Sequence, residues 1–299
     1  MDAPARRPQR TGQPEAELVR CPPAAPLRGP VLGYRGFRIG VRRTRQRLML
    51  PDGIVKLMIG FGDPVRVVDA VDPRQDVRAV SMANPVRVRA AVGEHTGSLH
   101  GVTVLLTPLA GYRLFRVPMA EWSDLALDPA DLLGPVVGQL SDRLAELPCW
   151  ADRFALLDRV LATWLAEGPV PSPEVVHAWR ELRRTGGRIR VEELAAETGW
   201  SRRTLERRFR QQIGHPPKAV AQIVRLQGAL RLLEAGGSCA RAAAEAGYHD
   251  QAHFDHTFRA MTGRTPGQFR RARAHADPAD PSDFVPDQVT SVLLAGARG

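Results

Sequence analysis

The chain has 299 residues, of which 43% are hydrophobic and 25% are charged, and its formal net charge is +10. This length and apolar content allow two domains with their own cores, and the basic excess favours a polyanionic partner such as nucleic acid. No apolar run approaches the length that crosses a membrane, so no membrane contact is expected. Three widely separated cysteines suggest neither a metal site nor paired disulfides, which favours a cytoplasmic protein.

The first 30 residues are rich in proline, arginine and alanine and offer little to bury. Such a composition cannot offset the entropy lost when a chain becomes ordered. Residues 1–30 are therefore predicted to form a disordered leader.

Residues 31–118 carry the pattern of short β-strands. Apolar or alternating runs are separated by turn sequences such as Pro51-Asp52-Gly53. Many short strands at this spacing indicate a small barrel or sandwich. The expected strands are 34–41, 54–61, 66–70, 77–82, 86–92, 102–106 and 114–117.

Two histidines of this region, His95 and His100, stand on either side of a Gly-Ser pair. Without a visible third ligand they are expected to be loop residues rather than metal ligands. Tyr112, Phe115 and Trp122 could line a pocket, but core packing explains them better. The sequence therefore identifies no ligand-binding residue.

Residues 128–167 change to helical periodicity. Two apolar stripes, beginning at Leu132 and Phe154, repeat every three or four residues. The stripes fit packing on the barrel. The proline-rich segment 168–173 then forms the clearest linker, so the first domain is expected to span residues 31–168.

Residues 191–271 contain the same short helical unit twice. VEELAAETGWSRRTLERRFRQQIGHPP begins at Val191, and CARAAAEAGYHDQAHFDHTFRAMTGRTP begins at Cys239. In each copy a small-residue helix ends at a glycine, and Ser201 or Asp250 then suits the N-cap of a second helix. Two helices joined by a tight turn form a helix-turn-helix, whose second helix can enter the major groove of DNA.

The second helix of the first copy has a strongly basic face. Residues 201–210 read SRRTLERRFR, with five arginines against one acid. Arginine serves both phosphate contact and bidentate reading of guanine. An isolated helix of this kind is usually only a solvated charged face, but the repeat favours DNA contact. The predicted DNA-contacting residues are Ser201, Arg202, Arg203, Thr204, Glu206, Arg207 and Arg210.

The second helix of the second copy is less basic. Glutamine can read adenine, and histidine can reach a phosphate or a base edge. This copy is therefore expected to contact DNA with a smaller electrostatic contribution. Its predicted DNA-contacting residues are Asp250, Gln251, Ala252, His253, His256 and Arg259.

Two further helices are expected around the repeat. One, at 173–184, opens the domain, and a longer one, at 217–235, links the two copies and has apolar residues on both sides. The linking helix would fix the spacing of the two second helices. Successive major-groove segments on one face of DNA lie about 34 Å apart.

With these features described, residues 172–274 resemble the double helix-turn-helix domain of the AraC/XylS family of bacterial transcription regulators. The resemblance is carried by LAAETGWSRRTLERRFRQQIGHPPKAV, IVRLQGALRLLEAG and AGYHDQAHFDHTFRAMTGRTPGQFRR, about a third of the chain. It implies recognition helices at 201–214 and 250–263, RNA polymerase as a partner, and a β-barrel sensor domain. It also implies dimer contacts on the helices after the barrel, so the two stripes at 128–167 fit contacts in a homodimer as well as packing on the barrel. The sequence departs from many members at Asp255 and His256, which affects the base contacts expected of the second helix.

Other interpretations are weaker. His249, His253 and His256 have the spacing of zinc ligands, but His249 precedes the expected N-cap. The sequence has no nucleophile elbow or phosphate loop, and Cys149 lacks the neighbouring histidine that DNA-alkyl-repair relatives need. A nonspecific architectural DNA-binding protein stays an alternative, with weak sequence preference and a steep salt dependence.

The tail, residues 275–299, is rich in aspartate, proline and alanine and is predicted to be disordered. The predicted fold is two-domain α+β, with a β-barrel-like domain and trailing helices at 31–168 and an all-α double helix-turn-helix domain at 172–274. The predicted function is sequence-specific transcription regulation without catalysis, metal or other cofactor. The expected partners are double-stranded DNA and RNA polymerase, with a small-molecule effector and a second copy of the chain left open.

Overall fold

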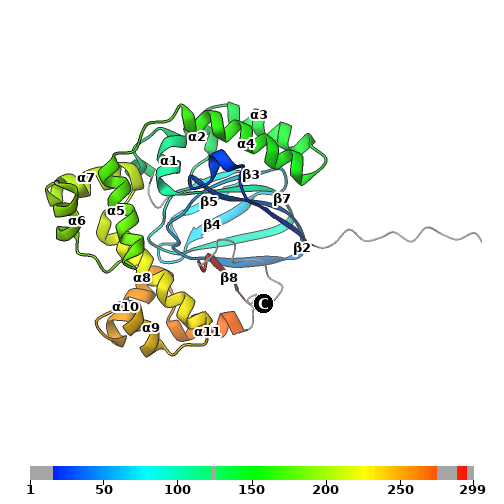
Figure 1. Ribbon diagram of the computed structural model, residues 1–299. Coiled ribbons are helices and arrows are strands. Elements are labelled where there is room, and N and C mark those ends of the chain that lie inside the picture. Colours follow the sequence, from blue (N-terminus) through cyan, green and yellow to red (C-terminus); the bar gives the residue numbers. More distant parts are fainter. Residues whose placement is uncertain (1–15, 123–125, 275–287, 295–299) are drawn as a thin grey trace, which may run out of the picture.

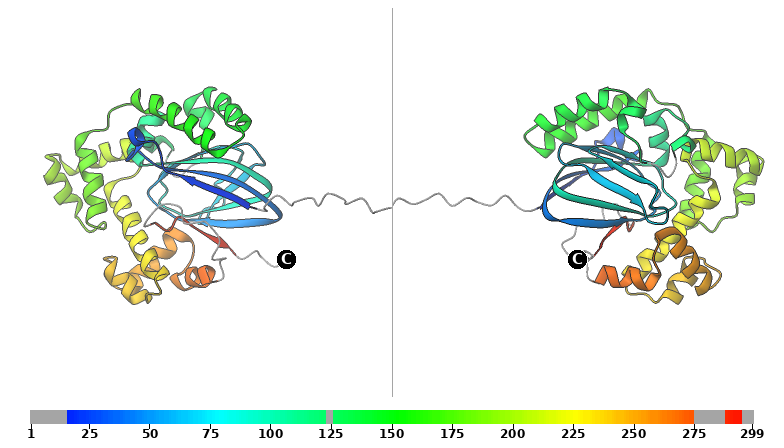
Figure 2. Two further views of the ribbon diagram at one scale, coloured as in Figure 1. Left: turned by 45° about the vertical axis from the view of Figure 1, so that its right-hand side comes forward. Right: turned by 180° about the vertical axis from the view of Figure 1, so that it is seen from behind.

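The computed structural model describes residues 16–122, 126–274 and 288–294. A strand-rich half-barrel carries a group of helices on one side, and a second helical region curves around one end of the sheet (Figure 1). Figure 2 shows the second group of helices outside the curved sheet in two further views. The predicted two-domain α+β fold class is confirmed.

Two long antiparallel strands, β2 and β7, organise the sheet. They pair along most of their lengths, with an irregularity between Val41 and Arg45 that lets the strands bend. The C-terminal part of β7 also pairs with β3, and its N-terminal part pairs with β4. The strands are β1 (Ala16–Cys21), β2 (Val31–Met49), β3 (Val55–Gly60), β4 (Val65–Asp69), β5 (Asp76–Ala79), β6 (Met82–Asn84), β7 (Ala91–Leu106) and β8 (Ser291–Leu294).

The strand predicted at 114–117 is wrong, because this segment begins inside helix α1 (Pro108–Phe115). The Thr107 hydroxyl caps α1 by accepting a hydrogen bond from the Ala110 amide at 3.2 Å. Pro108 suits the first helical position. These local signals outweigh the apolar run that suggested a strand.

The loop position predicted for His95 and His100 is also wrong. Both residues lie within β7, because pairing with β2 continues through the Gly-Ser pair between them. The strand predicted at 86–92 is irregular until β7 begins. In residues 86–90, which form no strand, Arg87 and Arg89 both pair with the carboxylate of Asp69.

The predicted leader is wrong for its second half. Ala16–Cys21 form β1, which pairs with residues 34–39 of β2, and Ala25–Leu27 form a 3-10 helix whose Leu27 is buried. Short apolar runs are enough to order this segment because β2 supplies the backbone hydrogen bonds. The rest of the predicted leader, residues 1–15, lies outside the described residues.

The predicted disordered tail contains a strand. β8 pairs with residues 46–49 of β2, on the same edge that β1 covers further along. Val289 and Val292 are buried there, at 1% and 0% exposed. Residues 275–287 and 295–299 lie outside the described residues, so that part of the prediction is untested.

The helices between the sheet and the linker cover one side of the half-barrel (Figure 1). Leu140, Leu144, Leu157 and Leu161 belong to the same core as the strands, so packing on the barrel is confirmed for these stripes. Dimer contacts stay a prediction. The helices are α1, the 3-10 helix η2 (Met119–Trp122), α2 (Pro129–Leu133), α3 (Val136–Glu146) and α4 (Trp150–Ala166).

The C-terminal helices follow the predicted order closely. Helices α5 to α7 enclose a core that includes Trp179, Leu205 and Phe209, whereas Phe254 and Phe258 belong to the core of the half-barrel. No helix in the described parts of the chain is long and apolar enough to cross a membrane. The helices are α5 (Pro173–Arg184), α6 (Val191–Thr198), α7 (Arg202–Ile213), α8 (Pro217–Glu234), α9 (Cys239–Glu245), α10 (Gln251–Thr262) and α11 (Pro266–Ala274).

Candidate nucleic-acid interface

The first helix-turn-helix unit is formed by α6 and α7. Helix α6 ends at Gly199, whose φ of +68° lies in the left-handed region that favours glycine. The Ser201 hydroxyl then caps α7 by accepting a hydrogen bond from the Thr204 amide at 3.2 Å. Leu205 and Phe209 are 0% exposed and fix one side of α7 in the core. The opposite side of α7 therefore faces solvent.

The outward face of α7 is basic. Arg202 forms ion pairs with Glu192 at 2.8 Å and with Glu206 at 3.0 Å, and its hydrogen bond to Glu206 raises the pKa of the guanidinium. In the part of the chain that the structure describes, neither a hydrogen bond nor an ion pair holds the side chain of Arg203 or Arg207. Both guanidinium groups are available to a partner.

The second unit, formed by α9 and α10, repeats this construction. Gly247 has a φ of +78° in the turn. The Asp250 carboxylate caps α10 by accepting a hydrogen bond from the His253 amide at 2.7 Å, and this bond lowers the pKa of Asp250. Phe254 and Phe258 are 0% exposed and occupy the buried side of α10, as Leu205 and Phe209 do in α7.

The thirteen predicted DNA-contacting residues all lie on α7, on α10 or at the N-caps of these helices. All are exposed except Thr204 and Glu206, which are half-buried. The structure thus brings the predicted residues onto two outward helix faces. It does not test their contact with DNA.

The histidines considered as zinc ligands do not form a cluster. His249 Nδ1 lies 3.0 Å from an Asp250 carboxylate oxygen, and the His253 ring packs edge-on against Tyr248 with 5.6 Å between ring centroids. Within the described ranges, no three His, Cys, Asp or Glu side chains lie close enough together to hold a metal ion.

The half-barrel contacts both units at the ends of α7 and α10. After α7, His215 Nε2 lies 2.8 Å from the carbonyl oxygen of Val86. At the end of α10, the carbonyl of Met261 accepts a hydrogen bond from the Ala90 amide at 2.7 Å. The short segment 86–90 of the half-barrel therefore contacts both helix-turn-helix units.

The linking helix α8 is attached to the half-barrel by Gln227, which is 6% exposed. Its Nε2 donates hydrogen bonds to the carbonyls of Pro51 at 2.6 Å and Val289 at 3.1 Å, and its Oε1 accepts from the Val289 amide at 2.9 Å. Sequence analysis missed Gln227 and His215. The available signal for Gln227 was a lone amide in an otherwise apolar helical stripe.

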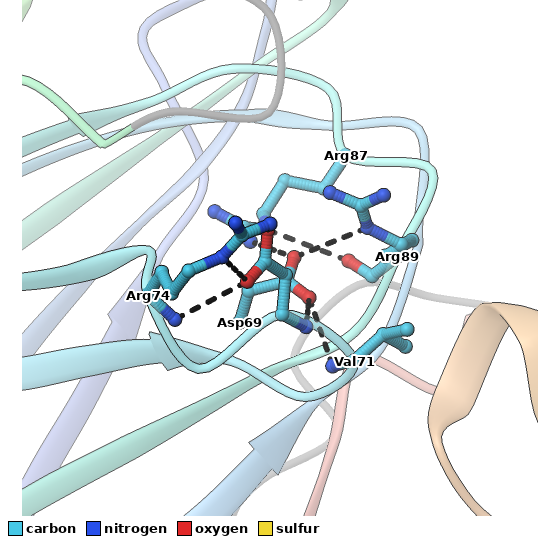
Figure 3. A network of polar contacts seen from close by, with 6 residues as sticks. Asp69, Val71, Arg74, Arg87 and Arg89 are labelled. Atoms are coloured by element: carbon cyan, nitrogen blue, oxygen red, sulfur yellow. Dashed lines mark hydrogen bonds and ion pairs between the residues drawn. The ribbon is translucent and has the colours of Figure 1, made fainter.

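A buried carboxylate stabilises the loops against which the second unit packs. Asp69 is 2% exposed, and its Oδ1 accepts hydrogen bonds from the amides of Val71 and Asp72 at 2.8 and 2.9 Å. Its Oδ2 accepts from Arg87 at 3.0 Å and Arg89 at 3.4 Å (Figure 3). The network joins the loop after β4 to the segment before β7.

These two loops also meet through their backbones. The Ala70 amide donates to the carbonyl of Ala90 at 2.9 Å, and the Ala90 amide donates in turn to Met261. Gly263, which ends α10, lies against Ala70 so closely that a Cβ there would come within 2.9 Å of the Ala70 carbonyl oxygen. The loops held by Asp69 therefore contact the end of α10.

A cavity of about 230 Å³ lies between the half-barrel, α5 and α8. The half-barrel contributes Asp52 and Ile54 to its lining, α5 contributes Trp179 and Arg183, and α8 contributes Arg231. Both domains thus line this space, and its lining contains charges of both signs.

The two capped repeats, with their buried and exposed sides, define a double helix-turn-helix protein. Residues 194–272 match the model of a family described as a helix-turn-helix domain. This match confirms the predicted helix-turn-helix domain type at the C-terminus.

Curated relatives resemble part of the chain. It is 34% identical over 82 residues to the HTH-type transcriptional regulator MtrA of Neisseria gonorrhoeae, a match that covers 27% of each protein. It is 34% identical over 92 residues to the uncharacterized HTH-type transcriptional regulator YbfI of Bacillus subtilis, covering 30% of this chain and 34% of that protein. The chain spans about a third or less of the length of these relatives.

A solved structure, that of ToxT from Vibrio cholerae, aligns with a TM-score of 0.44 and 11% sequence identity. The alignment covers 80% of this chain and 97% of that one.

Proposed function

We propose that the protein is a sequence-specific DNA-binding transcription regulator in which α7 and α10 read two adjacent major-groove segments. The observation that carries the proposal is the tandem repeat. Each copy has a capped second helix whose apolar side is buried and whose polar side is exposed. The exposed side of each helix suits insertion into a major groove.

The two helices have different parts in this proposal. On α7, Arg203 and Arg207 supply the base-edge or phosphate contacts, whereas Arg202 and Arg210 share Glu206 as an ionic partner. On α10, Gln251 and His253 offer hydrogen bonds with less charge. Most of the electrostatic affinity is therefore assigned to the first unit.

The test begins with selection of bound sequences from a random DNA library, followed by gel shifts on the selected site. Arg207→Ala should lower specific affinity by about 1–3 kcal/mol, the worth of a base-edge arginine. Arg159→Ala, an exposed arginine on α4, is the control and should leave affinity unchanged. Equal affinity of Arg207→Ala and the natural protein would remove Arg207 from the interface.

A salt series on the same DNA distinguishes the architectural alternative. A sequence-specific regulator should keep its preference for the selected site over random DNA as salt rises. A nonspecific binder should show a steep salt slope and little preference at any salt concentration. The two hypotheses thus differ in the ratio of two affinities measured under the same conditions.

We infer further that the half-barrel controls DNA binding, that the protein acts in the cytoplasm, and that it catalyses no reaction. The cavity between the domains supports this, because a small molecule there would contact both the half-barrel and α8. A homodimer and RNA polymerase as the protein partner belong to the same proposal, on the resemblance of residues 172–274 to transcription regulators. Ligand-dependent gel shifts and sedimentation at increasing protein concentration would test the effector and the dimer.

A further inference from the structure

A loop of the first helix-turn-helix unit reaches across to the second. The loop between α5 and α6 contains Arg188, whose Nη2 donates a hydrogen bond to the carbonyl of Glu245. Glu245 is the last residue of α9. A guanidinium suits this position because the carbonyl end of a helix carries partial negative charge. Arg188 thus connects the entry of one unit to the turn of the other.

The backbone of this loop is fixed against the linking helix. Gly186 and Gly187 have φ angles of +63° and +74°. A Cβ on Gly187 would lie 2.4 Å from the carbonyl oxygen of Ala221 on α8, so only glycine allows this approach. The Arg188 side chain therefore extends from a rigid base.

A second arginine contacts the same turn from α8. The guanidinium of Arg225 lies 5.5 Å from the centre of the Tyr248 ring, and its Nη1 lies 3.5 Å from the carbonyl oxygen of Gly247. Arg188 also packs against Gly247, where its Cγ and Nε would lie 3.3 Å from a Cβ on that glycine. The turn is held from the first unit and from the linking helix.

This turn sets the start of α10. Asp250, the N-cap of α10, follows Gly247 by three residues. A shift of the turn would therefore move the first residues of α10, including Gln251 and His253. The position of these residues relative to α7 determines how far apart the two DNA segments can lie.

We propose that Arg188 is a positioning residue that fixes α10 relative to α7 and so sets the spacing between the two DNA segments that the protein accepts. The proposal rests on the function proposed above. Arg188 acts through the α9–α10 turn, so its loss should change the tolerance for spacing rather than the sequence preferred within each segment.

The experiment compares the natural full-length chain with Arg188→Met, which keeps the side-chain length and removes charge and donors. Each protein selects from a library of random DNA, and affinity is measured on the selected two-segment site with one base pair inserted or removed between the segments. One base pair rotates the second segment by about 34°. Arg188→Lys keeps the charge, and Arg159→Met on α4 is the matched control.

The natural chain should select one spacing and bind the altered sites more weakly. In Arg188→Met this penalty should shrink by roughly tenfold, which is the lower end of what one hydrogen bond to a charged group is worth. Arg188→Lys should lie between the two, and Arg159→Met should match the natural chain. The preferred bases within each segment should be the same for all four proteins.

An unchanged penalty in Arg188→Met, or an equal loss of affinity on every spacing, would overturn the role of Arg188 and leave the proposed function intact. Failure of the natural chain to select any two-segment site would instead overturn the proposed function and this inference with it. Thermal unfolding of each variant confirms that the proteins compared are folded.

Discussion

Asp69 is the buried carboxylate on which two loops of the half-barrel depend. Asp69→Ala would leave the largely buried Arg87 without this partner and remove the acceptor of two backbone amides. Loss of one member of a buried ion pair costs about 3–5 kcal/mol, so a decrease in unfolding free energy near the lower end is expected. Urea unfolding provides the measurement.

The matched control for that experiment is Asp76→Ala. Asp76 also pairs with an arginine, Arg66, at 2.7 Å, but both side chains are exposed. The unfolding free energy of Asp76→Ala should therefore be nearly the same as that of the natural chain. Similar losses in the two variants would contradict the importance assigned to burial of Asp69.

His100 should make the half-barrel sensitive to acid. Burial lowers its pKa, and the charges of Arg38 and Arg153 lower it further, whereas Glu17 opposes them. The unfolded chain therefore binds more protons than the folded one as pH falls below the ordinary value of 6.5. Stability should be constant above that value and decrease as pH drops through it toward the lowered pKa.

The measurement is the urea midpoint as a function of pH for the natural chain and for His100→Gln. The variant should lose less stability between about pH 7.5 and pH 5.5, because one of the titrating groups is gone. Burial and then the charges of Arg45 and Arg47 lower the pKa of His95 as well. Part of the loss of stability in acid should therefore persist in His100→Gln. Parallel curves for both proteins would rule out His100 as a source of the effect.

At the scale of single helices, the N-cap Ser201 stabilises the first turn of α7. Ser201→Ala removes the oxygen that accepts the Thr204 amide and should lower the unfolding free energy by roughly 1 kcal/mol. Ser201→Asn supplies another acceptor and should retain the stability of the natural chain. A loss in both variants, measured by thermal unfolding, would show that the hydroxyl has some other role.

The helices of the repeat could be predicted because their signals are local. The N-caps Ser201 and Asp250 each accept a hydrogen bond from an amide three residues further along, and a glycine directly follows the last residue of α7 and of α10. The strands were harder, because β1 and β8 become strands only by pairing with β2, and the partner residues of β8 lie at the other end of the chain. Nothing near Gln227 shows that its partners are carbonyls of residues 51 and 289. The outward faces of the candidate site were therefore predictable, but not its supports on the half-barrel.

For the whole molecule, the boundary near residue 172 predicts that residues 172–274 fold alone and bind DNA. The structure adds that this fragment should be less stable than the full chain. Ile223, Leu226 and Leu230 on α8 pack into the core shared with the half-barrel, and Gln227 bonds to it. Circular dichroism and gel shift on the fragment provide the test. An insoluble or inert fragment would contradict the boundary.

The strand β8 has a consequence for how the protein is made. It follows the entire helical domain in the chain, yet it completes the edge of β2 at residues 46–49. During synthesis this edge stays unpaired until residues 291–294 have left the ribosome, and open strand edges are prone to aggregate. Premature termination just before Gln288 should therefore impair folding of the N-terminal half-barrel more than folding of the C-terminal helices, although the helices are made later.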